Sequence, residues 1–272
     1  MKVNKIENKS RKQGILTVLG VVFGIAALVG LAIAYDKMRD LWLEQCVITD
    51  VATQVSVTDG KMVRADTVAL EFGLKNGANV ALIDFKAERE RVMKKIPHIR
   101  NLTVVRHLPN RVDISVEERV PVARMNIRGS RAASDRVVDT DGVVFPWKRG
   151  TQTLPTIREA FAPGTPNGHR ISGHTLAALR LLETCAEKYP ELNILAVDVS
   201  KTDYLLATLG NYSELQIAWE GMDDPSEATV PALVRQLDCL AKSYNTRITD
   251  EAGVWIATQP GKVSFNNKKG RL

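Results

Sequence analysis

The chain has 272 residues, of which 44% are hydrophobic and 25% are charged, so it is long and apolar enough to bury one or two cores and is not disordered by composition. Its net charge is +6, but residues 1–13 hold five Lys or Arg and one Glu and so carry +4 of that total. The rest of the chain shows no basic stripe interleaved with aromatic residues, which argues against a nucleic-acid partner.

Residues 14–35 (GILTVLGVVFGIAALVGLAIAY) contain no charged side chain. A helix of this length spans about 30 Å, the thickness of the hydrocarbon core of a bilayer. The basic tail at 1–13 precedes the segment, and this charge bias predicts a single-pass type II protein with its N-terminus in the cytoplasm. The alternative is a signal peptide cleaved after Ala34, but the apolar stretch is longer than the 7–15 residues usual for such peptides.

After a predicted linker at 36–43, the spacing of apolar residues predicts a small α+β module over residues 44–119. We expect the order strand, helix, helix, strand, strand. The expected elements are a strand near Cys46–Val57, a helix Thr67–Phe72 capped by Asp66, a helix from Asp84 to Pro97, and strands Ile99–His107 and Arg111–Glu118. One face of this sheet should be covered by the helices.

A second domain is predicted over residues 120–266, followed by a flexible tail at 267–272. It should be mostly β with two helices, beginning near His174 and Thr229. A hairpin is expected around Asp141-Gly142, a pair that tolerates the positive φ of a tight turn. The further expected strands are 194–199, 204–209, 215–220, 254–258 and 262–265.

The junction between the two domains combines charges with a proline. Glu117, Glu118 and Arg119 are too polar for either core, and Pro121 lacks an N–H for a sheet ladder. We expect one extended segment to run from the first domain into the second. The three charged residues could clasp the domains together, or they could be surface ions worth well under about 1 kcal/mol each.

The sequence offers no catalytic constellation. It lacks Ser-x-x-Lys, Gly-x-Ser-x-Gly, His-Glu-x-x-His and a phosphate-binding loop. We therefore predict a protein that is not an enzyme and has no cofactor, metal or small-molecule substrate. Cys46, Cys185 and Cys239 are interpreted as three buried thiols, with a Cys185–Cys239 disulfide as the alternative.

The segment IPHIRNLTVVRHLPNRVDISVEERVPVA resembles the POTRA module of the bacterial cell-division family FtsQ, called DivIB in Gram-positive bacteria. That family shows a proline closing the second helix, an Arg-x-x-Pro turn and Glu-Arg-x-Pro-Val-Ala. Pro97, Arg106 with Pro109, and Glu118-Arg119 with Pro121 occupy those places here. An aspartate, a glycine and Val-Phe then follow at 139–145, also as in the family.

The resemblance implies a non-enzymatic scaffold of the division machinery, held in the bacterial inner membrane at the septum. It implies that the POTRA module helps to bring the protein to midcell. The C-terminal sheet would recruit the bitopic coiled-coil proteins FtsB (DivIC) and FtsL by strand addition at its edge. By position, the candidate contact residues are Val254, Trp255, Ile256, Lys262, Val263 and Phe265.

The chain departs from the family within these strands, because members often read VDLR-like where residues 254–257 read VWIA. Trp255 fits two interpretations, an anchor for a partner or a core residue. Two other functions compete with the scaffold. One is a POTRA-bearing envelope transport or assembly factor, and the other is a membrane-tethered envelope enzyme.

Overall fold

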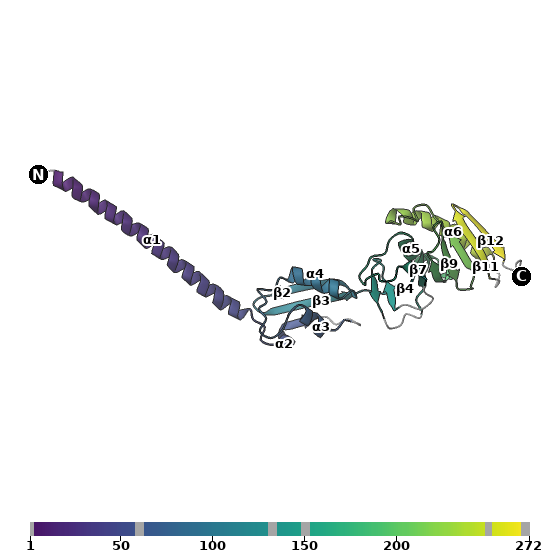
Figure 1. Cartoon of the computed structure of the whole chain (residues 1–272), viewed down its shortest axis with the longest axis horizontal. Helices are drawn as coiled ribbons and strands as arrows, with labels where there is room; N and C mark the ends of the chain where they lie inside the picture. The colour runs from purple at the N-terminus through teal and green to yellow at the C-terminus, as the bar shows by residue number, and fades with distance from the viewer. Residues whose placement is uncertain (1–2, 58–62, 130–134, 148–152, 248–251, 268–272) are drawn as a thin grey trace. The chain divides into compact units, whose positions relative to one another are not determined.

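The structure is a computed structural model that describes residues 3–57, 63–129, 135–147, 153–247 and 252–267 (Figure 1). Two compact units are present. One comprises Met1–Val92 and Leu102–Val116, and the other comprises Met93–Asn101 and Glu117–Leu272. Within the described residues the strands form a three-stranded sheet and a nine-stranded sheet, so the predicted α+β class is confirmed.

Helix α1 spans Val3–Gln45 and contains the uncharged segment. Its part Gly20–Gln45 is long and apolar enough to cross a membrane, judged by length and composition. The side chains of residues 20–41 are exposed, as a lipid-facing helix requires. Residues 36–43, the predicted linker, continue this helix, and neither glycine nor proline occurs between residues 31 and 45.

The three-stranded sheet follows α1. Its elements are α2 (Val51–Gln54), β1 (Val55–Val57), α3 (Ala65–Glu71), α4 (Phe85–Lys95), β2 (Ile99–His107) and β3 (Arg111–Glu118). The strand order is β1-β3-β2, with β1 parallel to β3. Both β2 and β3 have the predicted bounds, and the buried Val112 and Ile114 confirm the alternation of β3.

Two details of this module differ from the prediction. The expected first strand is reduced to Val55–Val57, and a helical turn, Val51–Gln54, precedes it. Asp50 accepts a hydrogen bond from the Ala52 N–H and Gln54 accepts from the Thr49 N–H, which favours this turn. The predicted capping role of Asp66 is also wrong, since Arg64 stands at the N-cap of α3 without a side-chain hydrogen bond. By contrast, Asp84 does cap α4, accepting from the N–H groups of Lys86 and Ala87.

The nine-stranded sheet has the order β12-β11-β10-β9-β8-β7-β4-β5-β6. Its strands are β4 (Ala123–Ile127), β5 (Arg136–Val138), β6 (Val144–Pro146), β7 (Thr156–Phe161), β8 (Ile194–Asp198), β9 (Leu205–Leu209), β10 (Glu214–Ile217), β11 (Gly253–Gln259) and β12 (Lys262–Asn267). Helix α5 (Gly173–Lys188) joins β7 to β8, and α6 (Val230–Thr246) joins β10 to β11. The predicted hairpin around Gly142 is confirmed as β5 paired with β6.

Both helices connect parallel neighbours, and this fixes the face that they cover. Strands β8 and β10 are each antiparallel to β9, so the two crossovers start from strands of the same direction and move the same way along the sheet. Right-handed crossovers of this kind place both helices on one face. Accordingly, α5 and α6 contact each other and share one hydrophobic core.

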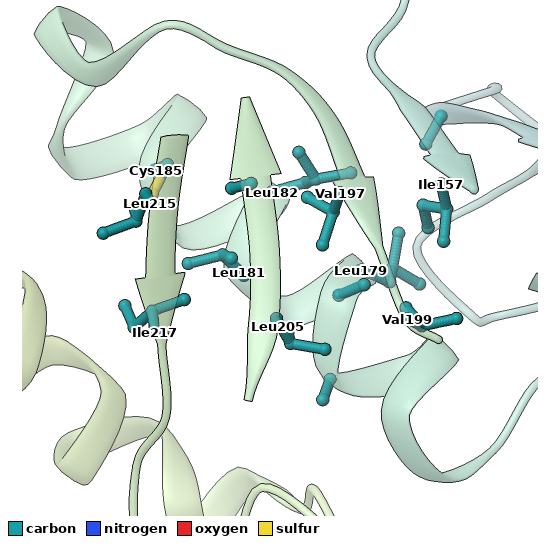
Figure 2. Packing of buried hydrophobic residues seen from close by; sticks show 14 of the residues in the cluster. Ile157, Leu179, Leu181, Leu182, Cys185, Val197, Val199, Leu205, Leu215 and Ile217 are labelled. Atoms are coloured by element: carbon teal, nitrogen blue, oxygen red, sulfur yellow. The ribbon is translucent and has the colours of Figure 1, made fainter. Parts of the chain in front are cut away.

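One row of residues across the sheet carries this core. The row is in register from strand to strand and consists of Met125, Ile157, Val197, Ala207, Leu215 and Trp255. All six side chains are buried. Figure 2 shows Ile157, Val197 and Leu215 packed toward Leu179, Leu181 and Leu182 of α5. The adjacent register row points to the opposite face.

Trp255 should therefore contribute strongly to stability. We expect Trp255→Ala to lower the free energy of unfolding of this domain by about 3–5 kcal/mol, because it leaves a large cavity under α6. Urea denaturation followed by circular dichroism measures the change. Ile256→Ala is the matched control, since Ile256 lies on the opposite face and is half-exposed, and it should cost clearly less. Equal losses for the two variants would contradict this assignment of faces.

Candidate partner-binding edge

Strand β12 is the terminal strand of the nine-stranded sheet at one end of its order. It pairs antiparallel with β11, and no other described strand lies on its outer side. Its outward N–H and C=O groups are thus the ones that a strand from another chain could complete. Lys262 is exposed on this strand, whereas Val263 and Phe265 are half-buried against the core.

The other three candidate residues lie on β11, which is an interior strand paired with β10 on one side and β12 on the other. Its backbone therefore offers no free edge. Trp255 is 3% exposed and packs on Phe265 and Tyr244, with ring centroids 4.6 and 5.6 Å away. Val254 and Ile256 are half-exposed on the opposite face. The structure thus answers the question about Trp255, which is a core residue.

Phe265 joins the edge strand to the interior. Its ring lies against Trp255 on one side, and the Arg247 guanidinium sits 4.4 Å from its centroid. The ring also covers Gly253, where an added Cβ would come within 2.2 Å of Phe265 Cζ. The Phe265 ring can occupy this position only because residue 253 is glycine, since any other side chain would displace it.

Gln236 is a residue that the sequence interpretation missed. It is 3% exposed in the apolar stripe of α6. Its Nε2 donates to the carbonyls of Ala257 and Gln259 at 2.8 and 3.0 Å, and its Oε1 accepts from the Gly261 N–H at 3.0 Å. The amide therefore holds the β11–β12 turn on α6. A signal for it exists in the sequence, because a polar residue stands beside Leu233, Leu237 and Leu240 at helical spacing.

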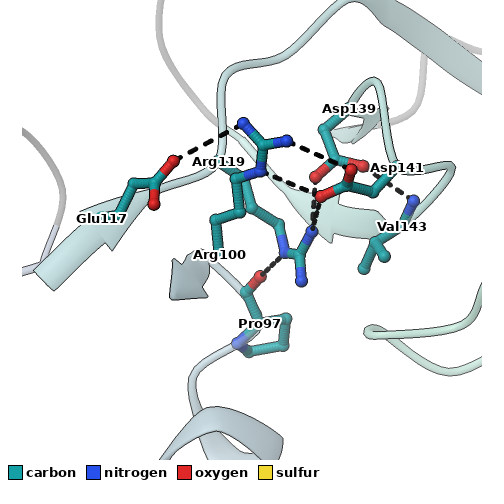
Figure 3. Close-up of polar contacts among 7 residues, drawn as sticks. All are labelled: Pro97, Arg100, Glu117, Arg119, Asp139, Asp141 and Val143. Atoms are coloured by element: carbon teal, nitrogen blue, oxygen red, sulfur yellow. Dashed lines mark hydrogen bonds and ion pairs between the residues drawn. The ribbon is translucent and has the colours of Figure 1, made fainter. Parts of the chain in front are cut away.

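The charged junction forms an ion cluster in which Arg119 is the central residue (Figure 3). Its Nη1 lies 2.5 Å from Asp139 Oδ2 and 3.4 Å from Asp141 Oδ2. The side-chain Nε of Arg119 donates to the Pro97 carbonyl at 3.1 Å, and the backbone N–H of Arg119 donates to the His98 carbonyl at 2.8 Å. The Arg119 and Asp139 side chains are only 12% and 2% exposed, so this pair is buried.

Arg100 forms the exposed part of the cluster. It contacts Asp141 at 3.0 Å and Glu117 at 3.5 Å. The hydrogen bond to Asp141 raises the pKa of the Arg100 guanidinium above its ordinary value. Of the predicted junction residues, Glu117 and Arg119 join the cluster, while Glu118 and Pro121 are half-buried beside it.

The continuous strand that we expected through the junction is not present. Strand β3 ends at Glu118, β4 begins at Ala123, and the two belong to different sheets. Pro121 lies in the segment between them, and pairing resumes at once, because the Val122 N–H donates to the Val138 carbonyl at 2.8 Å. The proline therefore stands where pairing with one sheet has stopped.

Asp139 is the second residue that sequence interpretation undervalued. Its Oδ1 accepts from the Val143 N–H at 2.8 Å and closes the tight turn at Gly142, where φ is +74°, as predicted. Its other carboxylate oxygen binds Arg119. One buried carboxylate thus serves both the turn and the junction.

The three cysteines are free thiols, so the Cys185–Cys239 disulfide is not formed. Cys46 and Cys185 are buried and Cys239 is partly exposed. Burial raises the pKa of Cys185 to about 12, which keeps it protonated and unreactive at neutral pH. In the described part of the chain, no group of three His, Cys, Asp or Glu side chains is arranged to hold a metal ion.

Comparison with known proteins identifies the module that precedes the junction. Residues 52–119 match the family described as POTRA domain, FtsQ-type. The chain is also similar to a protein of Clostridium acetobutylicum named cell division protein DivIB, with 24% identity over 104 residues. That alignment covers 38% of this chain and 40% of the relative, so it spans less than half of either protein.

The βααββ order of the elements, the Glu-Arg-x-Pro-Val-Ala segment after β3 and both comparisons agree. These findings support the resemblance inferred from the sequence: residues 52–119 match an FtsQ-type POTRA domain, and the chain is similar to a DivIB protein.

Proposed function

We propose that this protein is a non-enzymatic scaffold of the bacterial division machinery. It is held in the inner membrane by α1, with its N-terminus in the cytoplasm and its folded domains outside, and it works at the septum. The FtsQ-type POTRA match and the similarity to a relative named cell division protein support the role in division. The exposed apolar helix supports the anchor, and the basic tail supports its orientation.

The observation that carries the scaffold mechanism is the position of β12 at one end of the strand order, where no described strand pairs with its outer side; β6 is the strand at the other end. A strand from a partner can extend this sheet with main-chain hydrogen bonds, and the neighbouring side chains select the partner. The partners in this proposal are bitopic coiled-coil proteins of the FtsB/DivIC and FtsL type. Lys262, Val263 and Phe265 contribute directly, while the buried Trp255 supports Phe265 from below.

The surface of β12 suits regulated addition of a strand and guards against aggregation. The strand has six residues, carries the exposed Lys262, and ends in Asn266 and Asn267. Short, polar edges with a lysine resist indiscriminate pairing between sheets. Specific capture must then come from side-chain contacts as well as from the backbone.

The Arg119 cluster is the second part of the proposal. We infer that it fixes the path of the chain as it enters the C-terminal domain. The Arg119 guanidinium binds Asp139 and the Pro97 carbonyl, and the Arg119 backbone N–H donates to the His98 carbonyl, so side chain and backbone are both held. The idea that these residues clasp two domains together stays a prediction.

The rival functions receive less support. A transport or assembly factor of the outer membrane usually has several POTRA modules before a long barrel, whereas here a nine-stranded sheet with two helices follows a single matched module. For a membrane-tethered enzyme, the described residues contain no group of three His, Cys, Asp or Glu side chains placed to hold a metal ion.

Strand addition can be tested with prolines in β12. Successive residues of an edge strand direct their N–H groups alternately inward and outward, so one of the neighbours Val263 and Ser264 donates to β11 and the other points outward. We expect Val263→Pro and Ser264→Pro to differ. Proline at the inward position should lower the melting temperature of the domain, because it removes a hydrogen bond to β11. Proline at the outward position should leave the melting temperature nearly unchanged but abolish co-purification of FtsB- and FtsL-like proteins of the same bacterium.

Val263→Ala and Ser264→Ala are the matched controls, because they shorten the side chain and keep the N–H. If the proline that preserves the melting temperature also preserves capture, the binding edge is not β12. Deleting the whole region from Val254 to Phe265 would be a poor test, since it also removes Trp255 from the core.

The buried ion pair gives a second prediction. Arg119→Ala should lower the free energy of unfolding by about 3–5 kcal/mol, because it leaves the Asp139 carboxylate buried without its cation. Thermal and urea unfolding of the purified protein measure the loss. Arg100→Ala, which removes an exposed arginine from the same cluster, should change the melting temperature little. A negligible effect of Arg119→Ala would refute the structural role of the cluster.

Localisation tests the proposed function against its rivals. We expect an N-terminal fluorescent fusion of the full chain to concentrate at midcell in dividing cells, and depletion of the protein to yield filaments. Uniform labelling of the cell envelope with normal septation would contradict a role in division. The predicted orientation can be checked with a second reporter, an enzyme that is active only outside the cytoplasm, fused after residue 272. Activity of this fusion is expected.

A further inference from the structure

The face of the nine-stranded sheet opposite α5 and α6 contains a hollow of about 750 Å³ over β4, β7, β8 and β9. Arg124, Thr156, Leu195 and Tyr212 are among the residues that line it. A second hollow of about 530 Å³ shares Arg124 and Leu195 with the first. Pockets of this size hold small ligands or a few residues of a peptide. This region lies several strands away from β12 in the order of the sheet.

Arg124 is the polar centre of the hollow. It stands in register with Thr156 on the uncovered face, and its Nη2 donates to the Thr156 hydroxyl at 2.9 Å. Its Nε is buried and has no hydrogen-bond partner in the described structure. Among the described residues, no carboxylate lies within 4.0 Å of its guanidinium. The buried Nε is out of reach of a ligand, but the guanidinium as a whole lines the hollow, and a half-buried cation without an ion-pair partner favours an anion beside it.

Two exposed apolar side chains stand beside this cation. Of the large hydrophobic residues in the described part of the second unit, three are exposed: Val120, Leu195 and Tyr212. Two of these three line the hollow, with Leu195 39% and Tyr212 74% exposed. Tyr212 also has a φ of +61°, a conformation that few side chains adopt. Tyrosine and arginine are the types most often found at the centre of protein interfaces.

The carboxylates that also line the hollow have backbone partners. Glu159 accepts from the Gly129 N–H at 2.9 and 3.0 Å, and Asp198 accepts from the Ser200 N–H at 2.8 Å. Arg158 is exposed and stands in register with Asp198. The hollow therefore has balanced charge overall, but its carboxylates bind backbone N–H groups, whereas the printed hydrogen bond of the Arg124 guanidinium goes to the neutral Thr156 hydroxyl.

We propose that this hollow binds an acidic peptide segment of another protein. A carboxylate of the segment pairs with Arg124, and a neighbouring apolar side chain packs between Leu195 and Tyr212. An inorganic anion would satisfy Arg124 but would leave the two apolar side chains exposed, so the combination favours a peptide. This surface is separate from β12, and it would let the scaffold hold a second partner while the edge strand is occupied.

The test is site-specific photo-crosslinking of the full chain in living cells, with p-benzoylphenylalanine in place of Tyr212. We expect an adduct that mass spectrometry assigns to an Asp- or Glu-containing segment of another protein. Arg124→Gln should reduce its yield about tenfold or more, because a hydrogen bond to a charged group is lost. Arg158→Gln, at the exposed arginine of the same hollow, is the matched control and should leave the yield largely intact.

A second variant covers the possibility that Arg124→Gln impairs folding, which the melting temperature reports. Leu195→Glu places a negative charge on an exposed position and should reduce the adduct to a similar extent by repelling the peptide. The proposal is overturned if no adduct forms, if the adduct is a glycan, a lipid or a second copy of this chain, or if its yield is unchanged in Leu195→Glu and in folded Arg124→Gln.

Because β12 is intact in these variants, capture of FtsB- and FtsL-like proteins should persist, which separates this test from that of the proposed function.

Discussion

The handedness of two helix crossovers determines most of what the C-terminal domain can do. Because β7–α5–β8 and β10–α6–β11 start from strands of the same direction and move the same way along the sheet, both helices lie on one face. The apolar register row from Met125 to Trp255 is thereby buried. The opposite face and the strand β12 remain for interactions with other molecules. In the proposed function, stability and binding therefore belong to different surfaces of a single sheet.

The POTRA module was the part most open to prediction from sequence. The alternation in Arg111–Glu118 and the proline at position 109 are local signals, and they placed β2 and β3 within the bounds observed. The first strand was overestimated because side-chain hydrogen bonds from Asp50 and Gln54 favour a helical turn where the β-branched residues suggested a strand. Such local competition is hard to weigh without coordinates.

The edge position of the last strand was predictable from the sequence, whereas the surroundings of its side chains were not. Family resemblance indicated the last two strands, and β12 is indeed at the edge. Alternation alone could not say which face of β11 is covered, because that depends on how strands far apart in the sequence pair. The roles of Gln236 and Asp139 were missed for the same reason: Gln236 binds carbonyls more than twenty residues away, and Asp139 pairs with Arg119 across a gap of twenty.

The parallel pairing of β10 with β11 has a consequence for assembly. These strands are separated by the whole of α6, so their pairing closes a longer loop than a hairpin does and costs more chain entropy. Strand β12 rests on β11 and, through Phe265 and Gln236, on α6 itself. The edge strand therefore keeps its native position only while β11 and α6 are in place. If partners are recruited through β12, only a scaffold whose C-terminal domain is fully folded can bind them.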